Sequence, residues 1–300
     1  MKNRFRRYTI LLSLLIVLAA VARAEVGDEH LVMGNPSDAI TDSLNTTNYL
    51  MRKAEYVLSY NRSTSCPNWV SWHLNASWLG KVERQDDFRP DTSLPVGWLQ
   101  VMPKDYARTG FEQGHMCNSK DRTVTTNANS ATFLMSNMVP QSPRNNEQTW
   151  KNLEDYCRRL ALSSKSNEVY IICGPVGKGG VGGKGRRETL EARRKEGRSG
   201  TITVPSCTWK VALVLPHGKS SPADVTTNTM TIAVCVPNTQ TVTTDWTAYI
   251  TTVNDIEKLT GLTLFSAIDP TVASVIKKQQ YGPKVNYRVR GSGLGAETPR

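Results

Sequence analysis

The sequence predicts an α+β fold in a single domain. Several short apolar runs are typical of strands, one segment has a strong helical periodicity, and the chain contains no internal repeat. Short strands beside a separate helix are the pattern of this class. The composition, 39% hydrophobic and 21% charged residues, is that of a globular chain and excludes a disordered or collagen-like one.

Five segments have the composition of strands. Residues 69–74 and 98–101 are short and rich in aromatic or apolar side chains, which favours extended backbone. Residues 168–173 form an apolar run that ends at a Gly-Pro pair, where we expect the strand to stop. Two further apolar runs, residues 209–215 and 230–236, complete the predicted strands.

Two helices are predicted. In the longer one, apolar residues recur at spacings of three, four and three, which gives one apolar stripe over three turns: Trp150, Leu153, Cys157 and Leu160. A shorter helix is expected to open at residues 255–259.

Two segments interrupt this pattern. Gly and basic residues dominate residues 176–200, which predicts a surface insertion with one helical turn at residues 188–194. The polar tail, residues 284–300, is expected to be frayed and flexible. We therefore expect one domain at residues 25–283.

Residues 1–24 have the features of a secretory signal peptide. A basic start precedes an apolar run and then Ala22, Arg23 and Ala24, with small residues at the two positions that a signal peptidase reads. The run has about 12 residues, whereas a membrane-spanning helix needs about 20. An uncleaved N-terminal anchor is the alternative. Cleavage after Ala24 predicts a secreted or periplasmic protein that is not held in a membrane.

The formal net charge of +11 points to a polyanionic partner: nucleic acid, an anionic membrane or an acidic polysaccharide. Loss of residues 1–24 removes five basic and no acidic side chains, which leaves +6. Residues 176–200 and 271–300 each carry a net charge of +5, so the rest of the mature chain carries −4. The excess therefore lies in two appendages that could hold a polyanion near a site elsewhere.

The chain has six cysteines, which an exported protein can oxidise to a disulfide bond. Six cysteines allow 15 connectivities, and the spacing does not choose among them. The absence of a CxxC pair argues against a zinc knuckle or a thioredoxin-like site. A mature chain of 276 residues can bury its own core, so one or two bridges beside buried thiols fit the sequence at least as well as three.

Four residues define a candidate catalytic centre. His115 follows Gly114, which lets the backbone pass close to another element or to a ligand. On the longer helix, Asn146, Glu154 and Arg158 fall within about 120° of one another at 3.6 residues per turn. Amide and carboxylate oxygens suit Mg²⁺, and a guanidinium suits a phosphate. Taken singly, such residues are more often a structural histidine or part of a solvated helix face.

These residues and their flanks resemble the non-specific DNA/RNA endonuclease family, the ββα-metal or His-Me finger nucleases. The matching segments lie at residues 110–123, 132–141 and 145–158. Shorter matches extend the resemblance, in order, over most of residues 35–270: residues 49–51, 69–72, 84–90 and 204–210. The resemblance is closest to the secreted cyanobacterial members. It implies a single-domain fold with a central antiparallel sheet.

The resemblance also implies roles for individual residues. The family's Asp-Arg-Gly-His motif falls on residues 112–115, so His115 matches the general base that activates a water molecule. Asn146 matches the metal-binding asparagine, with the divalent ion otherwise held by water. Glu154 matches the carboxylate that orients one of those waters.

Three more residues match supporting positions. Arg84 and Arg158 correspond to arginines near the scissile phosphate, and Asn137 to an asparagine that supports the arrangement. The family cleaves single- and double-stranded DNA and RNA with Mg²⁺, for which Mn²⁺ is an expected substitute, and leaves 5′-phosphates. DNA and RNA are therefore the expected partners. A protein inhibitor is a further possible partner, but no feature of the sequence indicates whether one exists.

The chain departs from the family pattern in two places. Glu112 and Gln113 stand where the family has Asp and Arg. Gln113 keeps hydrogen-bonding capacity but loses the charge, which indicates either tolerated drift or an altered rate or substrate preference. Cys117 stands where the relatives usually carry Pro. A buried thiol or a disulfide fits better there than a nucleophile, because nothing places a base beside it.

The sequence thus favours a secreted, Mg²⁺-dependent, sequence-non-specific endonuclease. Two alternatives stay open. One is a catalytically weakened nucleic-acid-binding protein on the same scaffold, motivated by Gln113. The other is an exported scaffold that binds acidic polysaccharide through residues 176–200. Metal-dependent cleavage of nucleic acid would distinguish the enzyme from both alternatives.

Overall fold

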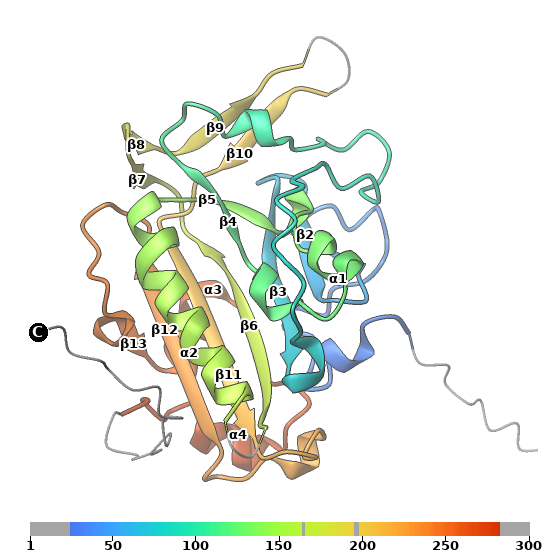
Figure 1. The fold of residues 1–300 in the computed structure, drawn as a ribbon, viewed down its shortest axis with the longest axis vertical. Helices are drawn as coiled ribbons and strands as arrows, with labels where there is room; N and C mark the ends of the chain where they lie inside the picture. Colours follow the sequence, from blue (N-terminus) through green and yellow to red (C-terminus); the bar gives the residue numbers. More distant parts are fainter. Residues whose placement is uncertain (1–24, 164–165, 195–197, 283–300) are drawn as a thin grey trace, which may run out of the picture.

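A seven-stranded sheet organises the molecule (Figure 1), of which a computed structural model describes residues 25–163, 166–194 and 198–282. The order is β1-β2-β3-β6-β11-β12-β13, and every neighbouring pair is antiparallel. The α+β class and the central antiparallel sheet are therefore confirmed. The strands are β1 (Tyr49–Arg52), β2 (Val57–Asn61), β3 (Cys66–Leu74), β6 (Glu168–Val176), β11 (Cys207–Leu215), β12 (Met230–Pro237) and β13 (Ile250–Thr251).

The interior strand β11 contributes to a hydrophobic core on each face of the sheet. Trp209, Val211 and Leu213 pack into one core, and Ala212 and Val214 into the other. Helix α2 (Lys151–Ala161) covers the second face, whereas α3 (Val253–Thr260) and α4 (Pro270–Ile276) cover the first (Figure 1). Because apolar side chains leave water on both faces, the long strands have nearly continuous apolar sequences.

A small hairpin lies beside α2 and completes a ββα unit. Its strands are β4 (Glu112–His115) and β5 (Met138–Gln141), paired antiparallel with His115 opposite Met138. Helix α1 (Thr126–Ala131) and two single turns, Ser119–Asp121 and Met135–Asn137, connect them. The chain then passes from β5 into the helix, so the hairpin and the helix are close in sequence as well as in space.

The predicted long helix is confirmed, and its apolar stripe is buried against the sheet. It begins differently from the prediction, because Asn145–Trp150 is π-helical before α2 starts at Lys151. A π-helical turn holds more residues than an α-helical turn, so Asn146 does not sit at the angle that 3.6 residues per turn predicts. Asn145 is buried and donates through Nδ2 to Thr208 Oγ1 at 3.0 Å.

Three of the other predicted strands are found within β3, β11 and β12, and the short helix is α3, which begins two residues before the predicted start. The predicted stop at Gly174-Pro175 is wrong, since β6 continues to Val176 while paired with β11. Gly174 permits this because a Cβ there would lie 2.4 Å from the carbonyl oxygen of Asn68 on β3.

Residues 98–101 do not form the predicted strand. Trp98, Leu99 and Val101 are buried in the core, which accounts for their apolar pattern. The backbone there is bound by a side chain, because Arg194 donates to the carbonyl oxygen of Gln100 at 2.8 Å. An apolar pattern in the sequence indicates that a segment is buried. It does not show that the segment pairs with a neighbouring strand.

Segment 176–200 contains hairpin strands, and the predicted helical turn at residues 188–194 is wrong. The strands are β7 (Gly180–Gly182), β8 (Gly185–Arg187), β9 (Thr189–Ala192) and β10 (Gly200–Thr203). In β9, Leu190 and Ala192 are buried and Glu191 is exposed, which is the two-residue period of a strand. Leu190 and Ala192 belong to the main core, so the segment is part of the fold as well as of the surface.

All six cysteines are thiols in this structure, so the predicted disulfide bond stays a prediction. Burial raises the pKa of Cys66 to about 12. Cys207 and Cys235 are half-buried on the neighbouring strands β11 and β12. A hydrogen bond between the two sulfur groups lowers the pKa of Cys207 to about 7.

The predicted signal peptide, residues 1–24, and the predicted tail, residues 284–300, lie outside the described residues. Within the described part of the chain, no helix is both long and apolar enough to cross a membrane.

Replacing Leu190 tests whether the β9–β10 hairpin is part of the core. We expect Leu190→Ala to lower the free energy of unfolding by about 2–5 kcal/mol, because it leaves a cavity among buried side chains. The control is Leu44→Ala, at a side chain that is 86% exposed, with an expected change below about 0.5 kcal/mol. Urea unfolding measures the free energy of unfolding of both variants. If Leu190→Ala lowered it as little as Leu44→Ala does, the hairpin would be only an appended loop.

Candidate active site

A polar cavity of about 220 Å³ lies where the β4–β5 hairpin meets the long helix. Six of the seven predicted site residues line it, and Asn137 lies behind it. The cavity is lined by Arg84, Gln113, His115, Asn118, Lys120, Asn146, Lys151, Glu154 and Arg158.

His115 sits at the end of β4 between two aromatic rings. The centroids of Phe88 and Phe133 lie 5.4 and 4.9 Å from the imidazole centroid. Trp150 donates to the carbonyl oxygen of His115 at 3.3 Å, which fixes the backbone. Burial, with a smaller effect of the Arg84 cation, lowers the pKa of His115 to about 3. The imidazole is therefore neutral at pH 7 and able to accept a proton.

The hydrogen-bonding of the His115 ring is incomplete within the described residues. Its Nε2 atom is buried and has no partner among them. A buried polar atom without a partner is uncommon in folded proteins and often marks a place where a ligand or water binds. The close approach predicted from Gly114 is also found, because a Cβ there would lie 2.2 Å from Gln141 Oε1 on β5.

Asn137 supports the site from behind. Its Oδ1 accepts a hydrogen bond from the backbone N–H of Cys117, and its Nδ2 donates to the carbonyl oxygens of Cys117 and Thr132, all at 2.9 Å. It thereby fixes the backbone just after His115. Cys117 is fully buried, and burial raises the pKa of its thiol, which argues against a nucleophilic role.

Asn146 lines one side of the cavity, and Glu112 holds its amide from outside the lining. The Nδ2 atom of Asn146 donates to Glu112 Oε2 at 2.8 Å, so the planar amide directs its carbonyl oxygen away from that carboxylate. Burial raises the pKa of Glu112. Gln113 donates to the carbonyl oxygen of Pro103 at 3.3 Å and brings no cation to the place where the family has an arginine.

Glu154 is the buried carboxylate of the site. Its Oε2 accepts a hydrogen bond from Asn118, and its Oε1 lies 3.4 Å from Lys210 Nζ. Burial raises the pKa of Glu154, against the opposing effects of Lys210 and Arg158.

The two arginines differ in freedom. Arg158 is held by Asp121 at 2.6 Å and by Asp155, and although burial opposes it, the Asp121 and Glu154 carboxylates raise its pKa. Arg84 is 44% exposed, pairs with the exposed Asp86 at 2.6 Å, donates to Ser119 Oγ at 3.0 Å and lies 4.8 Å from the centroid of Phe133. One guanidinium is therefore fixed in place, and the other lies at the rim where it can meet a phosphate.

These residues fit a divalent ion that has few protein ligands. Among the described residues, no three His, Cys, Asp or Glu side chains are grouped closely enough to bind a metal by themselves. Oxygen donors at the cavity include the amide oxygen of Asn146 and the carboxylate of Glu154, and the carboxylate of Glu112 lies beside Asn146. Mg²⁺ prefers such oxygen donors and usually keeps several waters.

The sequence analysis missed three residues that line the cavity: Asn118, Lys120 and Lys151. Lys151 lies three residues before Glu154, so helical spacing could have placed it on the same side. Asn118 caps the turn Ser119–Asp121, with Oδ1 accepting from the N–H of Lys120 at 2.7 Å. Nothing in the local pattern marks Asn118 as a partner of Glu154.

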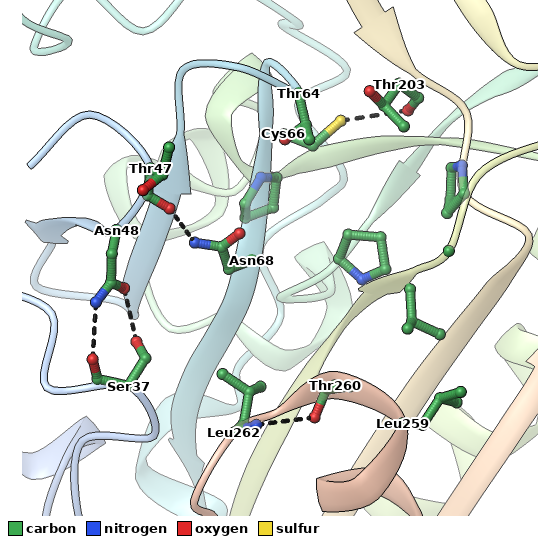
Figure 2. Close-up of a pocket in the computed structure, with 15 residues that line it drawn as sticks. Ser37, Thr47, Asn48, Thr64, Cys66, Asn68, Thr203, Leu259, Thr260 and Leu262 are labelled. Atoms are coloured by element: carbon green, nitrogen blue, oxygen red, sulfur yellow. Dashed lines mark hydrogen bonds between the residues drawn. The ribbon is translucent and has the colours of Figure 1, made fainter.

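A second cavity, of about 380 Å³, lies between β3 and the end of α3 (Figure 2). No charged side chain lines it, and it shares no residue with the first. Its polar side chains bind one another or the backbone: Asn48 pairs with Ser37, and Asn68 donates to the carbonyl oxygen of Thr47 (Figure 2). This cavity therefore lacks the groups that a phosphate or a metal ion needs.

Most of the chain is similar to known proteins. Residues 34–271 match the family described as DNA/RNA non-specific endonuclease. A protein named Nuclease from Nostoc sp. is 46% identical over 250 residues, which cover 83% of this chain and 85% of that protein. Nuclease C1 of Cunninghamella echinulata is 31% identical over 233 residues, which cover 75% of this chain and 85% of that protein.

The fold is also similar to that of solved structures. A chain in the crystal structure of the EndoG/EndoGI complex has a TM-score of 0.61 and 24% sequence identity, over 80% of this chain and 91% of that chain. Identity at this level shows the fold alone. It agrees with the ββα-metal fold that the sequence resemblance implies.

Two buried neutral histidines should make stability depend on pH. Burial lowers the pKa of His30 to about 4 and that of His115 to about 3, whereas in the unfolded chain both bind a proton near pH 6.5. The unfolded state then binds more protons, so the free energy of unfolding falls as the pH drops from about 6.5 to about 4. Each histidine contributes up to about 1.4 kcal/mol per pH unit. Urea unfolding between pH 7.5 and 4.5 measures the slope, and a slope that His115→Ala does not reduce would contradict this account.

Proposed function

This chain belongs to the DNA/RNA non-specific endonuclease family, and from that premise we propose that it is a secreted Mg²⁺-dependent nuclease that leaves 5′-phosphates on DNA and RNA. One observation carries the proposal: a neutral histidine, an asparagine amide and a buried carboxylate line a single cavity, with two arginines beside them. These groups match the needs of phosphodiester hydrolysis, and none of them presents a pattern that would read a base.

Each residue of the site has a separate role in the proposed reaction. His115, neutral at pH 7, accepts the proton of the attacking water. Arg84 and Arg158 bind the non-bridging phosphate oxygens and stabilise the charge that develops there. Asn146 would bind the metal ion through its amide oxygen, and Glu154 would orient a water of that ion. Bound Mg²⁺, or Mn²⁺ in its place, neutralises charge on the phosphate and the leaving oxygen.

Two alternatives are motivated by particular observations. Gln113 provides no cation to the cavity, which is compatible with a weakened enzyme that still binds nucleic acid. The exposed basic residues of segment 176–200 are compatible with a scaffold for acidic polysaccharide. The first predicts a gel shift without cutting, and the second predicts retention on heparin without cutting.

Export and partners are part of the same proposal. Residues 1–24 support secretion or transfer to the periplasm. An oxidising compartment would favour a disulfide, for which Cys207 and Cys235 are the neighbours on adjacent strands. A protein inhibitor is a proposed partner, because the similar solved fold is described in a complex concerned with inhibition.

A nuclease assay with a metal control tests the proposal. Plasmid DNA and RNA should be degraded with Mg²⁺ and stay intact with EDTA, and His115→Ala should lower the rate roughly 10²–10⁴-fold or more while the protein stays folded. The matched control is His217→Ala, at a side chain that is 71% exposed and away from the cavity, which should keep full activity. Turnover of His115→Ala at the wild-type rate would contradict the assignment of His115 as the general base.

The β7–β8 hairpin brings basic residues next to the strand that carries His115. Gly183 donates to the carbonyl oxygen of Gly110 at 2.7 Å, and Arg187 donates to that of Thr109 at 3.1 Å. Lys184, at the turn, and Arg186, on β8, are both exposed. Deleting residues 177–199 would also remove Leu190 and Ala192 from the core, so neutralising these two basic side chains is the sharper test of a role in binding.

We expect the double substitution Lys184→Gln and Arg186→Gln to raise KM and to flatten its dependence on salt. Each lost phosphate contact should reduce the slope against log salt concentration by about 0.9 for duplex DNA. Lys258→Gln on α3 is the control, since its side chain is 80% exposed and α3 covers the other face of the sheet. Steady-state kinetics between 50 and 200 mM salt measures both variants. A slope equal to that of the wild type would show that these two side chains do not contact the substrate.

A further inference from the structure

Lys210 is a fully buried lysine directly behind the cavity. It lies on β11, and its side chain is 2% exposed and does not line the cavity. The Nζ atom is 3.4 Å from Glu154 Oε1, 4.2 Å from the centroid of the Trp150 ring and 5.6 Å from that of Trp72. The ammonium group is thus surrounded by two aromatic rings and one carboxylate.

A buried ammonium group is costly unless an opposite charge accompanies it. Burial alone would lower the pKa of Lys210, but the carboxylate of Glu154 raises it above the usual value. The reverse also holds, because Lys210 is the first of the groups that oppose the effect of burial on the Glu154 pKa. Each charge therefore depends on the other, and the pair links the long helix to strand β11.

The geometry gives this pair an orientation as well as a charge. Lys210 approaches Oε1 of Glu154, and Asn118 donates to Oε2. With a donor on each oxygen, the plane of the carboxylate cannot turn without losing a bond. Glu154 is also one of the residues that line the cavity, so the fixed carboxylate presents its remaining lone pairs to that space.

We infer that Lys210 is a positioning residue, which holds the Glu154 carboxylate in its orientation toward the cavity and the metal ion without touching the substrate. The inference rests on the proposed function, in which Glu154 orients a water of that ion. A lysine that only filled space could be replaced by an apolar side chain of similar length, and the site would not change. A lysine that acts through Glu154 cannot be replaced in this way.

The experiment measures Mn²⁺ binding directly, so that it does not depend on turnover. Mn²⁺ is titrated into Lys210→Met and the wild type and followed by electron paramagnetic resonance. Loss of a group that supports a metal ligand typically costs 10–100-fold in affinity or activity. We expect Lys210→Met to weaken Mn²⁺ binding by at least tenfold and to lower kcat, with KM for the nucleic acid within about twofold. Lys210→Arg, which keeps the charge, should restore part of both.

A control on the same strand separates positioning from general loss of packing. Val214→Ala removes buried volume on the same face of β11, four residues further along the strand than Lys210. It should lower Tm while Mn²⁺ affinity and kcat stay at the wild-type values. Equal Mn²⁺ affinity in Lys210→Met and the wild type would overturn the inference. A wild type that binds Mn²⁺ but cuts nothing would instead overturn the proposed function.

A double variant covers the case in which Lys210→Met alone does not fold. Adding Glu154→Gln removes the carboxylate that would otherwise stay buried without a partner. If Lys210 acts through Glu154, the double variant should bind Mn²⁺ as tightly as Glu154→Gln alone, within about twofold. A further tenfold loss in the double variant would show that Lys210 acts by another route and would overturn the inference.

Discussion

The ion pair between Glu154 and Lys210 joins the two parts of the molecule on which the site is built. One residue belongs to the long helix and the other to the interior strand β11, and both are buried. Neither charge can be removed alone without leaving the other unpaired in a medium that solvates it poorly. The pair therefore links the helix to the sheet beside the apolar stripe of the helix, which packs in the same core. The hairpin that carries His115 contacts that helix through Trp150.

The side chains that act on a substrate are held by side chains that do not touch it. Asn137 fixes the backbone after His115, Asn118 and Lys210 hold Glu154, and Asp121 holds Arg158. These supporting hydrogen bonds and ion pairs are largely buried. In a buried setting they keep their geometry better than they would in water. His115 differs, because burial between aromatic rings and the nearby Arg84 cation lower its pKa and keep the imidazole neutral.

Net charge is a poor guide to this chemistry. The sum of +11 describes the whole chain, but residues 176–200 and 271–300 carry a net charge of +5 each, and residues 25–175 and 201–270 together are slightly acidic. The structure adds that segment 176–200 packs beside the strand leading to His115, through Gly183 and Arg187. The cavity itself is lined by a few cationic side chains: Arg84, Lys120, Lys151 and Arg158.

The sequence by itself determined the elements whose pattern is local: the strands within β3, β11 and β12, the apolar stripe of the long helix, and the order of His115, Asn146, Glu154 and Arg158 along the chain. Tertiary structure decided the features that depend on distant partners. Leu190 and Ala192 form a strand because a core contributed by other segments buries them, and residues 98–101 are buried without strand pairing because Arg194 binds their backbone. Lys210 lies 56 residues from Glu154 in sequence, so no local spacing could pair them. The physical reason is that burial and charge pairing are set by which segments meet, whereas periodicity records only which side of one segment is apolar.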